Sequence, residues 1–150
     1  MIPRRASRKL KIGNVTVGGN ASIAVQSMTK TDTRDVNATV NQVKELQECG
    51  CEIVRIAVPD KQAAESIPVI KKNTSLPIIA DIHFDYRLAL ASLQAGVDGI
   101  RLNPGNIHDR KQIAKVVSTA KEREIPIRIG VNAGSLPPNF EPELPLAQRM

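Results

Sequence analysis

The sequence predicts an α/β protein in which helices cover a parallel β-sheet. Segments typical of buried strands alternate with segments of helical spacing from residue 22 onward, and this alternation is typical of βαβ units. Aromatic residues make up 2% of the 150 residues and Trp is absent, so small aliphatic side chains must build the core. An open doubly wound sheet and a (β/α)8 barrel both fit the alternation.

The first elements are a hairpin, a strand and a helix. Residues 11–17 predict a small hairpin, because Gly-Asn lies between two short β-like pieces. Residues 22–28 are the first predicted strand of the sheet. Asp35 is placed to cap a helix over residues 36–49, which carries one apolar stripe, and Gly50 is placed to end it.

Strands and helices continue to alternate after Gly50. The further strands are predicted over residues 52–58, 76–82, 97–103 and 125–134, and the helices between them over 61–72, from Asp85 to about Ala95, and after Asp109. Pro68 is expected to kink or split the second helix, because proline has no amide proton for the helical ladder. The last strand has the pattern of a strand buried on both faces, with Arg128 as its one charge. Residues 136–150 are rich in proline and predict a loop.

Composition and charge exclude several classes of protein. The net charge is +6, but the excess lies in residues 1–31, and the remaining basic and acidic residues balance. Without interleaved aromatic residues, this distribution argues against nucleic-acid binding. No apolar run is long enough to span a membrane and no secretory signal is visible, so a cytoplasmic protein is expected. Cys49 and Cys51 are interpreted as packing residues, because a metal site needs more ligands nearby.

Polar side chains interrupt the predicted strands near their carboxyl ends. The strand residues are Arg55, Asp81, Arg101 and Arg128, and the polar residues two or four positions beyond three of them are His83, Asn103 and Asn132. Side chains at such spacings point to the same face of a strand, and ligands of α/β proteins bind at the carboxyl ends of the strands. Guanidinium groups match phosphate oxygens in geometry and charge. The sequence therefore predicts a site for an anion with more than one phosphate.

A structural interpretation of these residues competes with the anion site. A single strand arginine commonly pairs with a carboxylate, and Glu52 or Asp81 can serve Arg55 in this way. Three such arginines favour a ligand, because buried cations need partners and few carboxylates are available. Asp81 is expected either to bind a ligand hydroxyl or to orient an arginine. His83 fits a structural role as well as a catalytic one.

Five sequence blocks follow one another in an order and spacing that match one family. They are VQSMT at 25–29, IVRIAVP at 53–59, ADIHFDYRLAL at 80–90, RLNPGNI at 101–107 and IPIRIGVNAGSL at 125–136. Together they resemble the 4-hydroxy-3-methylbut-2-enyl diphosphate synthase family. The resemblance implies a (β/α)8 TIM barrel, here truncated after about its fifth strand. Residues 1–150 are then a partial substrate-binding domain, with βα units over 22–135, and the family's C-terminal iron–sulfur domain is absent.

The resemblance also implies an activity. The complete enzyme would reductively open 2-C-methyl-D-erythritol 2,4-cyclodiphosphate to 4-hydroxy-3-methylbut-2-enyl diphosphate, in the methylerythritol phosphate route to isoprenoids. Two electrons would come from ferredoxin or flavodoxin through a 4Fe-4S cluster, whose ligands, three cysteines and a glutamate, are not in this chain. The family is a homodimer, and a 150-residue chain alone is expected to be inactive.

The resemblance assigns roles to individual positions. Arg55, Arg101 and Arg128 match the arginines that clamp the diphosphate, Asn103 and Asn132 match other polar contacts, and Asp81 matches the carboxylate near the substrate hydroxyls, with His83 as a further possible contact. Two alternatives stay open. One is another phosphate-binding barrel, such as a dihydropteroate synthase-like enzyme, and the other is an inactive truncated product.

Overall fold

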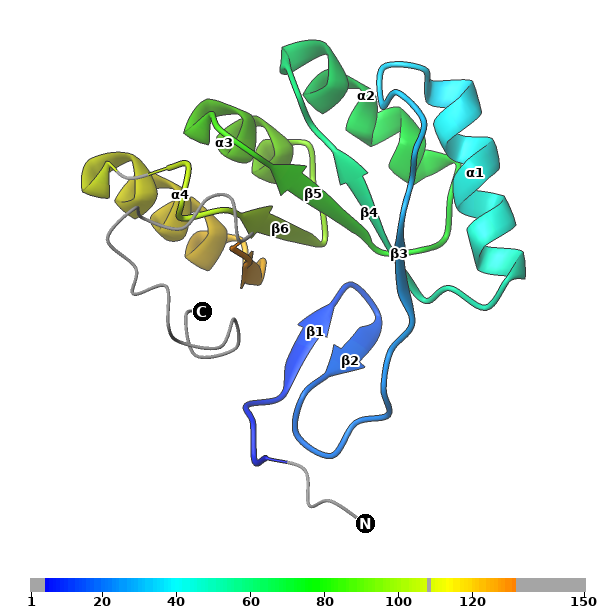
Figure 1. Cartoon of the computed structure of the whole chain (residues 1–150), viewed down its shortest axis with the longest axis horizontal. Coiled ribbons are helices and arrows are strands. Elements are labelled where there is room, and N and C mark those ends of the chain that lie inside the picture. Colours follow the sequence, from blue (N-terminus) through cyan, green and yellow to red (C-terminus); the bar gives the residue numbers. More distant parts are fainter. Residues whose placement is uncertain (1–4, 108, 132–150) are drawn as a thin grey trace, which may run out of the picture.

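A curved five-stranded parallel sheet with helices along one side forms the body of the molecule (Figure 1). The computed structural model describes residues 5–107 and 109–131. The strands of this sheet are β3 (Gln26–Met28), β4 (Ile53–Ala57), β5 (Ile78–Ile82), β6 (Gly99–Leu102) and β7 (Ile127–Ile129). Each strand pairs in parallel with the next one along the chain. This order suits a barrel and differs from a doubly wound sheet, in which the order reverses. The predicted barrel class is confirmed, as a barrel that stays unclosed within the described residues.

Four helices follow the strands in the described part of the chain, and each begins at an aspartate. They are α1 (Val36–Glu48), α2 (Lys61–Lys72), α3 (Tyr86–Gln94) and α4 (Arg110–Glu122), and their caps are Asp35, Asp60, Asp85 and Asp109. Each cap carboxylate accepts backbone N–H groups of the first helical turn, which satisfies donors that the helix itself leaves unpaired. The caps at Asp35, Asp85 and Asp109 were predicted, whereas sequence analysis missed the cap at Asp60.

Two sequence expectations need correction. Pro68 was expected to kink or split the second helix, but α2 runs through it as one helix, so the split is absent. Ile67 and Ile70 beside it are fully buried, and this packing offsets the cost of a helical proline, about 3 kcal/mol. The last strand is not buried on both faces, because β7 is an edge strand and Ile129 is 73% exposed. The predicted loop over 136–150 lies outside the described residues.

Strand β3 is shorter than the prediction of 22–28. It pairs with β4 alone, and this pairing begins where Gln26 lies opposite Ile53, the first residue of β4. The carbonyl oxygen of Val25 still accepts a hydrogen bond from the backbone N–H of Ile53, and the residue pairing of the two strands begins after it. The same register leaves Gln26 and Met28 on one face of the sheet and Ser27 on the other.

The two faces of the sheet carry different side chains. The face toward the helices is apolar: Val54, Ile56, Ile78, Ile82 and Ile100 are fully buried there and join the helices in one core. Burial of each such side chain contributes about 1.5–3 kcal/mol, so this layer fixes where the strands lie. The opposite face holds the polar strand residues and is free of helices in the described part of the chain (Figure 1).

An antiparallel hairpin, β1 (Leu10–Ile12) with β2 (Val15–Val17), lies at the amino end of the sheet, which confirms the predicted hairpin (Figure 1). Its turn residue Gly13 has a φ of 57°, and a Cβ atom there would lie 3.0 Å from the Pro77 ring. A larger residue would therefore push the turn away from the start of β5. The hairpin occupies the amino end and leaves the carboxyl end of the sheet open. No helix among the described residues is long and apolar enough to cross a bilayer.

Asp98 joins three elements beside the hairpin, and its loss is expected to destabilise the fold. Its carboxylate accepts hydrogen bonds from Lys71 Nζ and from the backbone N–H of Ile78, both at 2.8 Å. Asp98→Ala leaves the Ile78 N–H without its acceptor and Lys71 with only the carbonyl oxygen of Gly96. The substitution should lower the free energy of unfolding by about 1–3 kcal/mol, measured by urea denaturation. Glu65→Ala is the control, because it removes only an exposed pair with Lys61. Equal losses in the two variants would contradict this account.

Candidate anion-binding site

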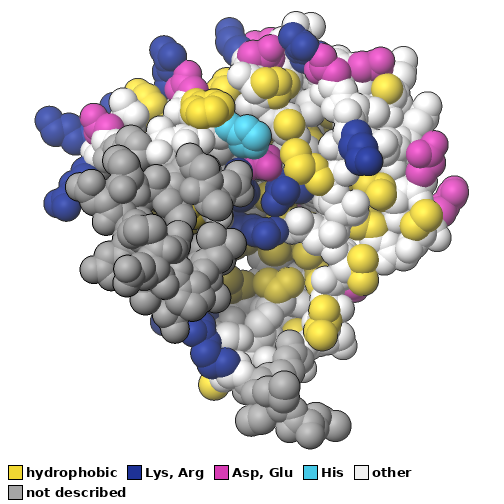
Figure 2. Space-filling model, viewed as in Figure 1, with side chains coloured by type: hydrophobic (Ala, Val, Ile, Leu, Met, Phe, Trp, Pro, Cys, Tyr) yellow, Lys and Arg dark blue, Asp and Glu magenta, His cyan; other side chains and the backbone are white. Residues whose placement is uncertain are grey.

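A cavity of about 440 Å³ lies over the polar face of the sheet, toward the carboxyl ends of the strands. Its lining residues are Met28, Arg55, Asp81, His83, Arg101, Arg128, Gly130 and Val131. Figure 2 shows basic side chains gathered around a hollow in the visible face, next to an acidic side chain and a histidine. Five of the seven residues predicted as site residues therefore meet in one cavity.

The strand register explains why these side chains converge. Asp81 lies opposite Arg101, and Arg101 lies opposite Arg128, so the three form one row across β5, β6 and β7. Arg55 lies on the same face of β4, two residues before Ala57, the register partner of Asp81. The arginines thus belong to three different strands, with Arg101 and Arg128 in one row and Arg55 two residues before it.

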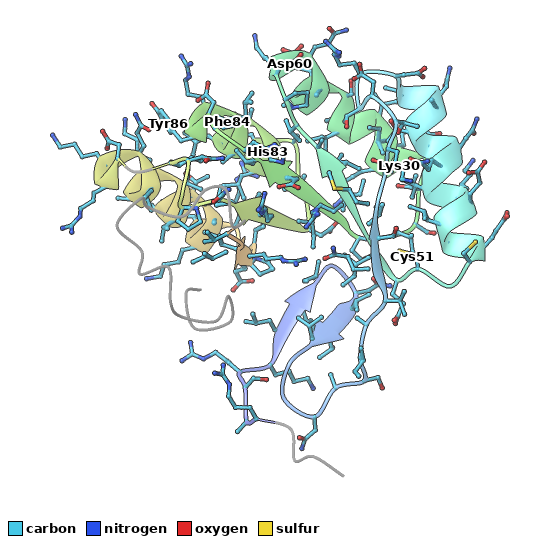
Figure 3. All side chains as sticks on the ribbon, viewed as in Figure 1. Lys30, Cys51, Asp60, His83, Phe84 and Tyr86 are labelled. Carbon is cyan, nitrogen blue, oxygen red and sulfur yellow. The ribbon has the colours of Figure 1, made fainter. Side chains whose placement is uncertain are left out.

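Asp81 is at the centre of the cluster. Its side chain is only 3% exposed, and both carboxylate oxygens have cationic neighbours. Oδ1 accepts a hydrogen bond from Arg101 Nη1 at 3.0 Å, and Oδ2 lies 3.2 Å from Arg55 Nε. His83 Nε2 is 3.5 Å from Oδ2, although its side chain is half exposed, and Figure 3 shows His83 at the end of β5. Asp81 therefore orients arginines, one of the two roles that the sequence suggested.

Arg101 is held from both neighbouring strands. Its guanidinium, 8% exposed, bonds to Asp81 on one side and donates from Nη2 to the carbonyl oxygen of Gly130 at 2.9 Å on the other. A Cβ atom on Gly130 would lie 3.1 Å from Arg101 Nε. The absence of a side chain at Gly130 therefore leaves space for the Arg101 guanidinium.

Arg128 and Arg55 also have uncharged partners, both on β3. Arg128 Nη1 donates to Gln26 Oε1 at 3.0 Å, and Arg55 directs Nε and Nη2 toward Met28 Sδ at 3.3 Å. Sequence analysis gave Gln26 and Met28 no role at the site. The alternation of side chains along β3 was the available signal.

The cluster has an excess of positive charge. Three guanidinium groups line the cavity, and Asp81 is the only acid among the described residues that line it. Other arginines at this end of the sheet have carboxylates of their own. Hydrogen bonds from Arg34 lower the pKa of Asp32 to about 2, and Arg87 lowers the pKa of Asp85 in the same way. Those pairs are neutral overall, so the uncompensated charge lies in the cavity and suits a multiply charged anion.

Asn103, one of the two predicted asparagines, is not among the residues that line the cavity. Strand β6 ends at Leu102, and Asn103 begins a turn in which its Oδ1 accepts a hydrogen bond from Gly105 N at 3.0 Å. Asn103 lines a separate apolar groove beside α4 together with Ile107 and Val116. Asn132 lies outside the described residues. A ligand contact by either asparagine stays a prediction.

The cysteines do not fit an iron–sulfur cluster. Cys49 is exposed after α1, and Cys51 is buried with Sγ 3.0 Å from the carbonyl oxygen of Ile53. In Figure 3, Cys51 lies at the opposite end of the sheet from His83. A 4Fe-4S cluster takes about four protein ligands, mostly thiolates. The sequence has two cysteines, and no group of three or more His, Cys, Asp and Glu in the described ranges is arranged to hold a metal ion.

Comparison with known proteins identifies the family. Residues 7–147 match the family described as the GcpE TIM-barrel domain. The chain belongs to this family. Several curated relatives carry the name 4-hydroxy-3-methylbut-2-en-1-yl diphosphate synthase (flavodoxin), which confirms the resemblance found in the sequence blocks.

These GcpE relatives are closely similar but longer. The protein of Dehalococcoides mccartyi is 64% identical over 100% of this chain and 43% of its own length. The protein of Caldanaerobacter subterraneus subsp. tengcongensis is 62% identical over 89% of this chain and 38% of its own length. The Bacillus cereus protein is 57% identical over 91% of this chain and 37% of its own length. The chain thus spans less than half the length of these relatives.

Removal of the Asp81 charge is expected to destabilise the cluster. Asp81→Asn leaves the buried Arg101 without its ionic partner, which should cost about 3 kcal/mol in the free energy of unfolding. Pyrophosphate should restore part of the loss, since an added anion replaces the missing charge. Urea denaturation with and without pyrophosphate measures both effects. Asp32→Asn is the control, because the Asp32–Arg34 pair is exposed. A loss in Asp81→Asn no greater than in the control would contradict the central role of Asp81.

Proposed function

We propose that the complete protein is a 4-hydroxy-3-methylbut-2-en-1-yl diphosphate synthase and that this chain contains the part that binds its cyclic diphosphate. The observation that carries the proposal is the cluster of three inward-facing arginines around one buried carboxylate, in a member of the GcpE TIM-barrel domain family. Family membership favours this function over a dihydropteroate synthase-like barrel.

The proposed reaction is a reductive ring opening. 2-C-Methyl-D-erythritol 2,4-cyclodiphosphate takes up two electrons and two protons and loses one oxygen atom as water. The cyclic diphosphate becomes the linear allylic product, 4-hydroxy-3-methylbut-2-enyl diphosphate. The substrate and product both carry a diphosphate, so a clamp of fixed guanidinium groups suits each of them.

The arginines of the proposed clamp have more N–H donors than their contacts within the protein use. A guanidinium has five N–H donors, and within the described residues one nitrogen of Arg128 has an acceptor, the amide oxygen of Gln26. Arg101 uses Nη1 and Nη2 for protein contacts, each with one bond. The remaining N–H groups of Arg55, Arg101 and Arg128 are available to phosphate oxygens. Asp81 keeps two of these arginines in place and is itself shielded by them.

The electrons require groups outside this chain. Because Cys49 and Cys51 do not fit a cluster, we place the cluster ligands in the remaining part of the complete protein. The names of the relatives specify flavodoxin, so we propose flavodoxin, rather than ferredoxin, as the electron donor. The homodimer and the cytoplasmic location stay predictions.

Replacement of the clamp arginines tests the proposal. Arg55→Met, Arg101→Met and Arg128→Met should each weaken binding of the cyclic diphosphate about ten- to hundredfold, since a charge-assisted hydrogen bond contributes about 1.5–3 kcal/mol. Calorimetry on the complete protein measures the affinity, and circular dichroism checks the fold. Arg87→Met removes the same charge from an exposed pair with Asp85 and should bind like the parent. Parent-like binding by all three clamp variants would refute the clamp, and loss of the fold in all three would favour a structural role.

The chain alone is expected to hold no cluster and to form no product. Anaerobic reconstitution of the 150-residue chain with iron and sulfide should yield substoichiometric iron, and no turnover should follow addition of reduced flavodoxin. The two open sheet edges, β3 and β7, should also promote self-association, measured by sedimentation. The complete protein is the positive control. A stoichiometric cluster on the chain, together with product, would contradict the proposal that the cluster ligands lie in the remaining part of the complete protein.

A further inference from the structure

Strand β3 supplies side chains that hold two of the three cavity arginines without opposing their charge. Gln26 Oε1 accepts a hydrogen bond from Arg128 Nη1 at 3.0 Å. Two residues later on the same face, Met28 Sδ lies 3.3 Å from both Nε and Nη2 of Arg55. An amide and a thioether are neutral acceptors, so they fix the direction of a guanidinium and leave its full positive charge in place.

The other arginines in the described part of the chain that have side-chain acceptors show the contrast. Arg34 and Arg87 lie against Asp32 and Asp85, and both Arg55 and Arg101 lie against Asp81. In each case a carboxylate both orients and compensates the guanidinium. The partner of Arg128 orients its guanidinium but carries no charge to compensate it. Because Arg128 lies on an exposed edge strand, its side chain could otherwise extend into solvent.

The bond between Gln26 and Arg128 crosses the open face of the sheet. Strands β3 and β7 are the two edges, and the bonded residues are 102 positions apart in the chain. Both side chains also line a second cavity of about 410 Å³, which extends toward the hairpin and is lined mainly by apolar residues. Arg128 lines this cavity and the polar one. Gln26 therefore holds the guanidinium of the exposed Arg128 at the boundary of the two cavities.

We propose that Gln26 is a positioning residue that holds the Arg128 guanidinium ready for an anion while preserving its charge. The inference rests on the proposed function, in which the polar cavity binds a diphosphate. Holding a long side chain in its bound direction before the ligand arrives lowers the entropy cost of binding. A carboxylate at position 26 would hold the side chain equally well but would cancel the charge that attracts the ligand.

This difference gives an experiment with inorganic pyrophosphate as the probe and the complete protein as the sample. Gln26→Glu keeps an acceptor for Arg128 and adds a negative charge; Gln26→Met removes the acceptor and adds none. We expect Gln26→Glu to weaken pyrophosphate binding about tenfold or more and to reduce its dependence on salt, since one attractive charge is cancelled. Gln26→Met should weaken binding about three- to tenfold with the salt dependence of the parent.

Two further variants separate this inference from the proposed function. Gln62→Glu adds the same charge on the exposed side of α2 and should bind like the parent. Arg101→Met tests whether the polar cavity is the place where pyrophosphate binds. If Arg101→Met loses binding while both Gln26 variants fold and bind like the parent, the positioning role is overturned and the proposed function stands. If the parent itself does not bind pyrophosphate, both are overturned.

The Gln26 variants also distinguish positioning from a merely structural bond. A structural role predicts lower thermal stability in Gln26→Met and normal stability with normal binding in Gln26→Glu. If Gln26→Met fails to fold, Gln26→Glu decides: a folded protein with weakened, less salt-dependent binding supports the inference, and parent-like binding contradicts it.

Discussion

The buried carboxylate of Asp81 is the contact on which the arrangement of the cavity depends. It lies 3.0 Å from Arg101 Nη1 and 3.2 Å from Arg55 Nε, so it brings two cations together that would otherwise repel each other. Its single charge compensates only part of theirs, and Arg128 adds a further one. The cluster is thus stable enough to form in the protein and still positive enough to attract an anion. Partial compensation is the physical basis of the proposed clamp.

The order of the strands and the packing of the helices place the arginine cluster at one end of the sheet. The helices bury the apolar face of β4, β5 and β6, which leaves the polar residues on the opposite face. The hairpin lies at the amino end, where a Cβ atom at Gly13 would meet the Pro77 ring, so the opening lies at the carboxyl end. The contact between Gln26 and Arg128 requires β3 and β7 to curve toward each other. The barrel-type curvature of the sheet therefore also forms the cavity.

Sequence alone predicted the strand–helix alternation, three of the helix caps and the inward direction of Arg55, Asp81, Arg101 and Arg128, because period-two spacing and capping are local properties. It missed what depends on distant residues. The partner of Arg128 is 102 positions away, and no local pattern reveals it. The predicted strand over 97–103 extended to Asn103, whereas β6 ends at Leu102. The barrel was distinguished from an open doubly wound sheet by resemblance to a family, and then by the strand order.

A crystal structure of the complete protein with its cyclic diphosphate bound would test the central claim most directly. The account predicts phosphate oxygens within hydrogen-bond distance, about 2.7–2.9 Å, of the guanidinium groups of Arg55, Arg101 and Arg128. It also predicts that Asp81 still bonds to Arg101 and that Gln26 still holds Arg128. A diphosphate bound elsewhere, with these arginines unchanged and facing an empty cavity, would contradict it.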